Sequence, residues 1–118
     1  MDMPETEAVI VFATFTTRDE AEQIGEALVE RRLAACGSVV PTVHSFYYWE
    51  GKLHREHEAL LLLKTAAEKV PEINAFIKAE GSHETPEVLA VGVDSGLPAY
   101  IDWLLSDVRT SGKREKVL

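Results

Sequence analysis

The chain has few cysteines, few basic residues and no long apolar runs, and each of these features argues against a class of protein. It has one cysteine, Cys36, in 118 residues, which excludes an internal disulfide and suits a reducing compartment, so we expect a cytoplasmic protein. Lys and Arg number 12 against 20 Asp and Glu, and the formal net charge is -8. This balance argues against nucleic acid and against anionic membrane surfaces as partners, because both attract clustered positive charge.

Long apolar runs are also missing. No apolar stretch reaches the roughly 20 residues that a membrane span needs. Residues 1–8, MDMPETEA, have neither the basic segment nor the apolar segment of a signal peptide. We therefore expect no membrane partner.

What the chain does have is the composition of a globular domain. Hydrophobic residues make up 46% and charged residues 27%, which is typical of a folded domain rather than a disordered one. A chain of 118 residues can bury one ordinary core. We expect a single domain over residues 1–109, followed by a polar tail over residues 110–118, TSGKREKVL, which shows no periodicity.

The longest organised stretch is residues 34–65, AACGSVVPTVHSFYYWEGKLHREHEALLLLKT. Two runs rich in β-branched, aromatic and aliphatic residues flank residues 50–52, EGK, which predicts a β-hairpin. Each arm can hold roughly a dozen residues, about twice an ordinary strand, and so reaches about 40 Å. A chain of this size cannot cover that length with its own strands, so the far end is expected to pair with other copies. Proline cannot donate to a ladder, so we expect a bulge or bend at Pro41.

Shorter elements surround the hairpin. Apolar runs over residues 8–15 and 87–94 predict two strands in the middle of a sheet. Thr17, with Glu20 three residues later, predicts a capping box at the start of a helix that runs to about Arg32. Two more helices are expected, one over residues 67–79 and ended by Gly81, the other starting at the SGLP segment (95–98) and containing Ile101, Leu104, Leu105 and Val108.

The order of these elements is β-α-β-β-α-β with a closing helix. That order predicts an α+β, ferredoxin-like sandwich, which has one antiparallel sheet and helices on one face. Right-handed crossovers would place the first and last strands centrally or next to the hairpin.

Five segments resemble, in order and spacing, the CutA family of divalent-cation tolerance proteins. They are ERRLAACGSVVP (30–41), SFYYWEGKL (45–53), LLLLKT (60–65), ETPEVLAV (84–91) and AYIDWL (99–104). The resemblance covers about residues 8–108. It implies a ferredoxin-like protomer in a tight homotrimer, similar in architecture to PII signalling proteins. It also implies binding of Cu²⁺ or other divalent cations, and it implies no enzymatic activity.

The resemblance also suggests metal ligands. Cys36 stands at the family's cysteine position, and a thiolate is a soft ligand suited to copper or zinc, although a free cysteine more often acts as a small buried hydrophobe. Family members often carry histidine just before the E-x-P-E segment, where this chain has Gly81. His83, two positions later, is the candidate replacement. No local pattern supplies the base that a nucleophilic cysteine needs.

Five ionisable residues of the hairpin form a second candidate group. They are His44, His54, Glu56, His57 and Glu58. On a strand, the odd spacing of His54 and His57 sends them to opposite faces, so they do not chelate as a pair. A three-residue turn would set His44 opposite Glu56 or Glu58, and a two-residue turn would set it opposite His57. Either arrangement is an ordinary cross-strand pair or a metal or intersubunit site.

Two further predictions concern assembly and ligands. Aromatic residues at the hairpin tip are expected to anchor a trimer interface: Tyr47, Tyr48 and Trp49. Three charged residues are expected near an intersubunit cleft: Lys64, Glu84 and Glu87. A lysine in such a place is more often a solvated charge or part of a salt bridge, but it can also hold an anion. The alternative function is therefore a PII-like regulatory module that binds an anionic small molecule. The chain has no Walker-type glycine loop for a nucleotide.

Overall fold

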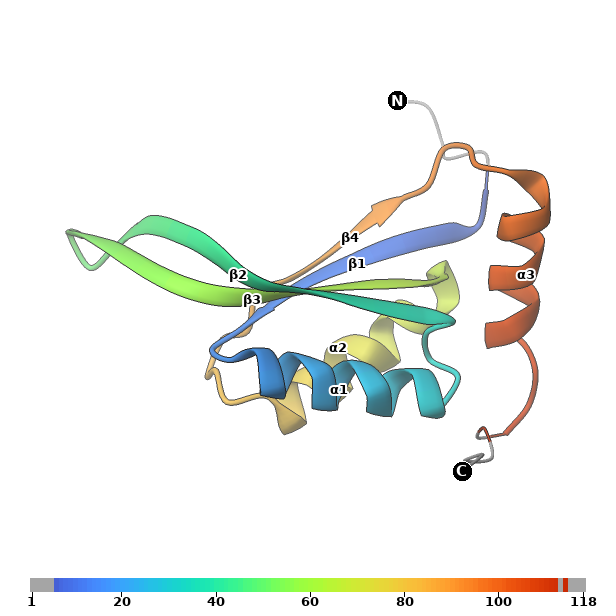
Figure 1. Ribbon diagram of the computed structural model, residues 1–118, viewed down its shortest axis with the longest axis horizontal. Coiled ribbons are helices and arrows are strands. Elements are labelled where there is room, and N and C mark those ends of the chain that lie inside the picture. The colour runs from blue at the N-terminus through green and yellow to red at the C-terminus, as the bar shows by residue number, and fades with distance from the viewer. Residues whose placement is uncertain (1–5, 113, 115–118) are drawn as a thin grey trace.

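The computed structural model describes residues 6–112 and residue 114 (Figure 1). The predicted domain start at residues 1–5 and the tail residues 113 and 115–118 lie outside the described part. In chain order the elements are β1 (Ala8–Phe15), α1 (Arg18–Glu30), β2 (Cys36–Trp49), β3 (Lys52–Ala66), a 3₁₀ turn (Ala67–Lys69), α2 (Val70–Glu80), β4 (Val88–Gly92) and α3 (Pro98–Val108). None of the described helices is long and apolar enough to cross a membrane.

The described strands form an antiparallel sheet in the order β2-β3-β1-β4. Helices α1 and α2 cover one face of this sheet, and α3 stands at the end of the sheet far from the hairpin tip (Figure 1). This arrangement confirms the ferredoxin-like βαββαβ prediction with its closing helix.

The main core lies between the sheet and the two covering helices. Alternate residues of β1 and β3 point into it, as the period of a strand requires. The largest buried side chains of this core are Val11, Phe15, Leu28, Leu61, Leu63, Ile73 and Ile77. A smaller cluster holds α3 against the ends of the strands and contains Ala8, Ala35, Ala66, Leu104 and Val108.

Thr17 caps the start of α1 as predicted, but the Glu20 side chain binds elsewhere and does not complete the expected capping box. The backbone N–H of Glu20 donates to Thr17 Oγ1 over 3.1 Å. The Glu20 carboxylate reaches across to the loop after α2, where it accepts from the backbone N–H of Ser82 at 2.8 Å and from its hydroxyl at 3.1 Å. The helix ends at Glu30 rather than near Arg32, because Arg32 takes a left-handed conformation with φ 59°.

The long hairpin is also confirmed, and its turn has two residues. Trp49 pairs with Lys52, while Glu50 and Gly51 have φ values of 51° and 77°. Two successive positive φ values are the signature of a type I′ turn, whose twist matches that of the flanking strands. The three-residue turn is therefore wrong.

The bulge expected at Pro41 is present. The register of β2 against β3 shifts between Val40, which pairs with Leu60, and Val43, which pairs with Glu58. Two residues of β2 thus lie opposite one residue of β3, which removes proline from the ladder. Beyond this bulge the hairpin leaves the body of the protein and protrudes alone (Figure 1).

The prediction that β4 lies in mid-sheet is wrong. β4 is an edge strand of the described sheet, next to β1 and away from the hairpin, and it is shorter than the apolar run suggested. Leu89 and Val91 are 64% and 54% exposed, and they pair with Phe12 and Ile10 on the face opposite the helices. Leu89 and Val91 thus belong to an uncovered sheet face, whereas Val88 packs against the main core.

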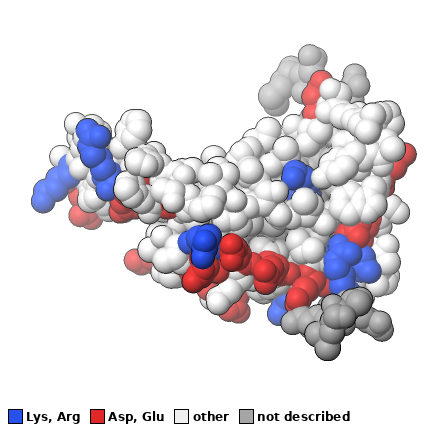
Figure 2. All heavy atoms as spheres, in the orientation of Figure 1, with Lys and Arg blue, Asp and Glu red and all other residues white. Residues whose placement is uncertain are grey.

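Charge is distributed unevenly around this fold. Figure 2 shows acidic side chains gathered along the edge formed by α1 and α2. The surface over the sheet, between the hairpin and α3, is mostly uncharged. A single chain therefore has an acidic helical edge and a largely uncharged sheet face.

Candidate functional site

A groove of about 750 Å³ lies between the hairpin and the loop that precedes β4. It combines imidazoles, carboxylates and aromatic rings from three separate segments. The lining residues are Thr14 of β1, His44, Ser45, Phe46, Tyr47, Trp49, Glu56 and Glu58 of the hairpin, and His83, Glu84, Thr85 and Glu87 of the loop. The groove thus contains two of the residues expected near a cleft, together with the candidate ligand His83.

Contacts with β1 and α1 hold the loop in place. The backbone N–H of Thr14 donates to the carbonyl of Glu87 over 3.4 Å. The hydroxyl of Thr16 lies 3.4 Å from His83 Nε2. Ser82 is bound to Glu20 at the start of α1. The loop side of the groove is therefore fixed to the rigid body of the domain.

The groove is electronegative. Four carboxylates line it, and none of the lining residues in the described chain is lysine or arginine. Partial desolvation, a hydrogen bond to Glu56 and the charges of Glu56 and Glu58 raise the pKa of Tyr47 above its ordinary value. A groove of this sign favours a cation over an anion.

One chain does not bring the two predicted metal ligands together. Cys36 pairs with Lys64 across the hairpin, and Lys64 pairs with Ile10 of β1. His83 lies beside Thr16, just past the other end of β1. Six residues of extended chain separate these points by about 20 Å. Among the described residues, no group of three or more His, Cys, Asp or Glu side chains is close enough to hold a metal ion.

Lys64 lies apart from the other predicted cleft residues. Its ammonium donates to Cys36 Sγ over 3.7 Å, and both residues are half-buried on the sheet face opposite the helices. Glu84 and Glu87 lie in the groove at the other end of β1. The chain therefore separates a lysine–thiol pair from a carboxylate groove. Cys36 and Lys64 are cross-strand partners because the hairpin turn has two residues, a length that the sequence did not decide.

The backbone at Gly81 explains why a side chain is disfavoured there. Its N–H donates to the carbonyl oxygen of Ile77 over 2.8 Å, closing the end of α2. A Cβ atom at this position would lie 2.8 Å from the same oxygen. A histidine at Gly81 would require the backbone to shift.

The tip of the hairpin is largely exposed in a single chain. The predicted interface residues Tyr47, Tyr48 and Trp49 all reach solvent, and so does Phe46, which the sequence interpretation did not single out. Tyr47 stacks on His54, with ring centroids 5.4 Å apart. Phe46 belongs to the same aromatic run, and that run was the signal that would have identified it.

The hairpin register decides the histidine pairs. His44 lies directly opposite His57, and their ring centroids are 4.3 Å apart. His54 lies on the other face, where its Nε2 is 3.2 Å from the Trp49 carbonyl oxygen. The prediction that His54 and His57 point to opposite faces is confirmed.

The fold and the groove define a small ferredoxin-like protein with a protruding hairpin and an acidic cleft suited to cations. Comparison with known proteins identifies the family, because the family model described as CutA1 divalent ion tolerance protein matches residues 9–107. The chain belongs to this family, which confirms the resemblance seen in the sequence.

The relatives include proteins from bacteria, archaea and animals. The chain is 38% identical over 95 residues to the divalent-cation tolerance protein CutA of Thermus thermophilus, covering 80% of this chain and 92% of that protein. It is 37% identical over 93 residues to protein CutA of Mus musculus, covering 79% of this chain but only 52% of the longer mouse protein.

Solved structures agree with this assignment. The CutA structure from Thermus thermophilus superposes with a TM-score of 0.82 at 36% identity, covering 85% of this chain and 97% of that one. The Archaeoglobus fulgidus structure, described as a periplasmic divalent cation tolerance protein, gives 0.83 at 33% identity, covering 86% of this chain and 99% of that one.

Proposed function

We propose that this protein binds divalent cations, copper foremost, and acts in metal tolerance without catalysis. The observation that carries the proposal is the electronegative groove, with four carboxylates and two imidazoles, in a chain of the CutA1 family. The Thermus thermophilus relative is called a divalent-cation tolerance protein, and we extend that role to this chain. The single cysteine suits a cytoplasmic location, although the Archaeoglobus fulgidus structure is described as periplasmic.

The proposal includes a homotrimer. The sheet face opposite the helices exposes a group of apolar side chains, among them Val40, Leu89 and Val91, and the hairpin tip adds exposed aromatic rings. Contiguous apolar surface of this kind marks interaction sites, and the unpaired edges of β2 and β4 offer further hydrogen-bonding groups.

Assembly also bears on the metal ligands. Cys36 and His83 of one chain lie at opposite ends of β1, so an ion that used both would need them from different copies. Cys36 supplies a thiolate, which favours copper or zinc over hard cations. A trimer would therefore allow a copper site of Cys36 and His83 that the described part of one chain does not form.

The alternative is a PII-like regulatory module that binds an anionic small molecule. Lys64 supports it, because its ammonium reaches the open sheet face. The groove opposes it, because its four carboxylates repel an anion. The cation function is thus the better supported of the two.

Calorimetric titration of the purified, tag-free protein tests the proposal. We expect Cu²⁺ and Zn²⁺ to bind and ATP and simple carboxylates to give no heat. Light scattering at micromolar concentration should give about three times the 13.1 kDa chain mass. Cys36→Ser should keep the assembly and lose the copper that the thiol binds, while Ser38→Ala, on the same strand and face, should change neither. Anion binding without cation binding would favour the alternative.

A further inference from the structure

The outer half of the hairpin places two imidazoles face to face. His44 and His57 pair directly across β2 and β3, and both side chains are exposed. Residues that flank a two-residue turn form a hydrogen-bonded pair, and the two kinds of pair then alternate along the ladder. Counting from Trp49–Lys52 makes His44–His57 a non-hydrogen-bonded pair. In such pairs the Cα atoms are only about 4.5 Å apart and the side chains approach closely.

We propose that His44 and His57 form a two-histidine chelate for a borderline divalent cation, Cu²⁺ first and then Ni²⁺ or Zn²⁺. Imidazole is a good ligand for all three ions. Two ring nitrogens that share one ion at about 2.0–2.1 Å each lie roughly 3 Å apart. The ring centroids of this pair are 4.3 Å apart and the ring planes are 44° from parallel, so the two rings already lie within the reach of a single bridging ion.

The neighbours of the pair determine what kind of site it is. On the same face, one step toward the tip, Phe46 pairs with Arg55. Glu56 and Glu58 adjoin His57 in sequence but point to the opposite face. No carboxylate of the described hairpin therefore joins the two imidazoles on their own face, in keeping with the lack of a three-ligand cluster among residues 6–112 and 114. Within the described chain the site supplies two protein ligands, and the remaining positions of the ion are open to water or to a neighbouring copy.

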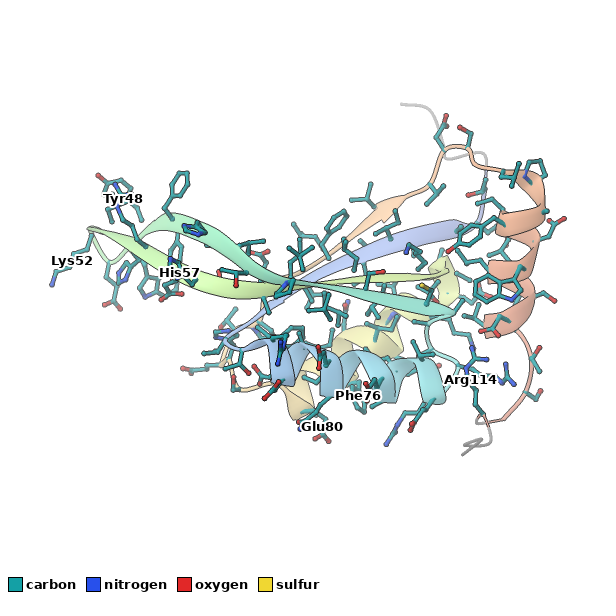
Figure 3. The ribbon with its side chains drawn as sticks, in the orientation of Figure 1. Tyr48, Lys52, His57, Phe76, Glu80 and Arg114 are labelled. Carbon is teal, nitrogen blue, oxygen red and sulfur yellow. The ribbon has the colours of Figure 1, made fainter. Side chains whose placement is uncertain are left out.

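The location of the site is set by the fold. The His44–His57 pair lies between the tip, where Figure 3 shows Tyr48 and Lys52, and the body of the domain. The bulge at Pro41 separates it from Cys36 along β2. The biological role of this site rests on the proposed function in cation binding. Its two ligands, however, do not include the Cys36 thiol.

Copper titration of matched variants tests the inference. The parent is the full-length Cys36→Ser protein, and the probe is Cu²⁺ alone, followed by calorimetry and by electron paramagnetic resonance. The parent should bind one Cu²⁺ per chain with a signature of two nitrogen ligands. Adding His44→Ala or His57→Ala should weaken copper binding by at least about 10- to 100-fold. Loss of a residue that only hydrogen-bonds to a metal ligand already costs that much affinity, and these variants lose a ligand itself. His54→Ala removes an imidazole from the other face and should leave binding unchanged.

The outcomes separate this inference from the proposed function. If the His44 and His57 variants bind copper as tightly as the His54 variant, the chelate does not exist, whereas cation binding stands. If the Cys36→Ser parent loses all copper binding that the natural chain shows, the thiol site stands and the chelate is again overturned. If the natural chain binds no divalent cation, both fall. Circular dichroism and elution volume check that each variant folds and assembles.

Discussion

The two halves of the hairpin share one pair of strands but are stabilised in different ways. In the inner half, residues 59–66 of β3 pair with β1, residues 60–64 also pair with β2, and helices cover one face. In the outer half, residues 52–58 of β3 pair with β2 alone, and most side chains reach solvent. The inner half is held by the core. The outer half depends on its turn, its cross-strand pairs and, as we propose, its neighbours in a trimer.

Leucine truncation should show the largest difference between the halves. Leu61 is buried in the main core, and Leu61→Ala should lower the free energy of unfolding by about 2–5 kcal/mol. Leu53, on the same strand, is 46% exposed, and Leu53→Ala should cost under about 1 kcal/mol. Urea unfolding at one fixed protein concentration measures both, because assembly makes stability depend on concentration. Equal losses would mean that the outer half is buried as deeply as the inner half.

A charge at the hairpin tip should act on assembly rather than on the fold. Trp49 and Lys52 face each other across the turn and differ in chemistry, so they form a matched pair. Trp49→Glu should strongly weaken the proposed trimer, because burying an unpaired charge costs several kcal/mol, whereas Lys52→Glu should cost under about 1 kcal/mol. Light scattering over a dilution series gives the two association constants. Equal effects would remove the tip from the interface.

The sequence predicted the strands and helices of the domain better than the turn of the hairpin and the position of β4. Apolar runs, the Thr17 cap and the effect of a proline depend on residues that are close together in the sequence. The strands, the helices and the bulge at Pro41 could therefore be predicted. The turn could not be settled, because it requires a positive φ at Glu50, and glutamate gives no sign of adopting one. β4 was misplaced because apolarity alone does not say whether a strand faces a core or an uncovered surface.

The site could be predicted only in part for a related reason. Segments that are distant in the chain, such as Thr14 and the loop containing His83, meet through the sheet order. The pairing of Cys36 with Lys64 and of His44 with His57 depends on a register that one residue in the turn would have changed. Residue types identified the chemistry, and the register decided which groups meet.

The smallest expected effect lies at the end of the molecule opposite the hairpin tip. There Arg109, just after α3, donates from its Nε and an Nη to both carboxylate oxygens of Glu68, over 2.8 Å and 3.1 Å, and also to Glu7 over 2.8 Å. The hydrogen bond from Arg109 lowers the pKa of Glu68, and the hydrogen bond to Glu68 in turn raises the pKa of Arg109. This ion pair ties α3 to the body by polar contacts, as a complement to the apolar core.

The pH dependence of that pair follows from the direction of the Glu68 shift. Because the pKa of Glu68 is lower in the folded state than its ordinary 4.5, the stabilisation is present above pH 4.5 and is lost as pH falls through the folded pKa. The side chain of Glu68 is 49% exposed and that of Arg109 is 39% exposed. Solvent screening therefore limits the contribution of this ion pair to the free energy of unfolding to under about 1 kcal/mol. Glu68→Gln should therefore lower the urea midpoint slightly at neutral pH, and the difference from the natural chain should shrink in acid and in high salt. Glu80→Gln, an exposed substitution on α2, is the control and should show no such convergence (Figure 3). A Glu68 deficit that stays constant from neutral pH to acid would show that packing, and not charge, holds α3 in place.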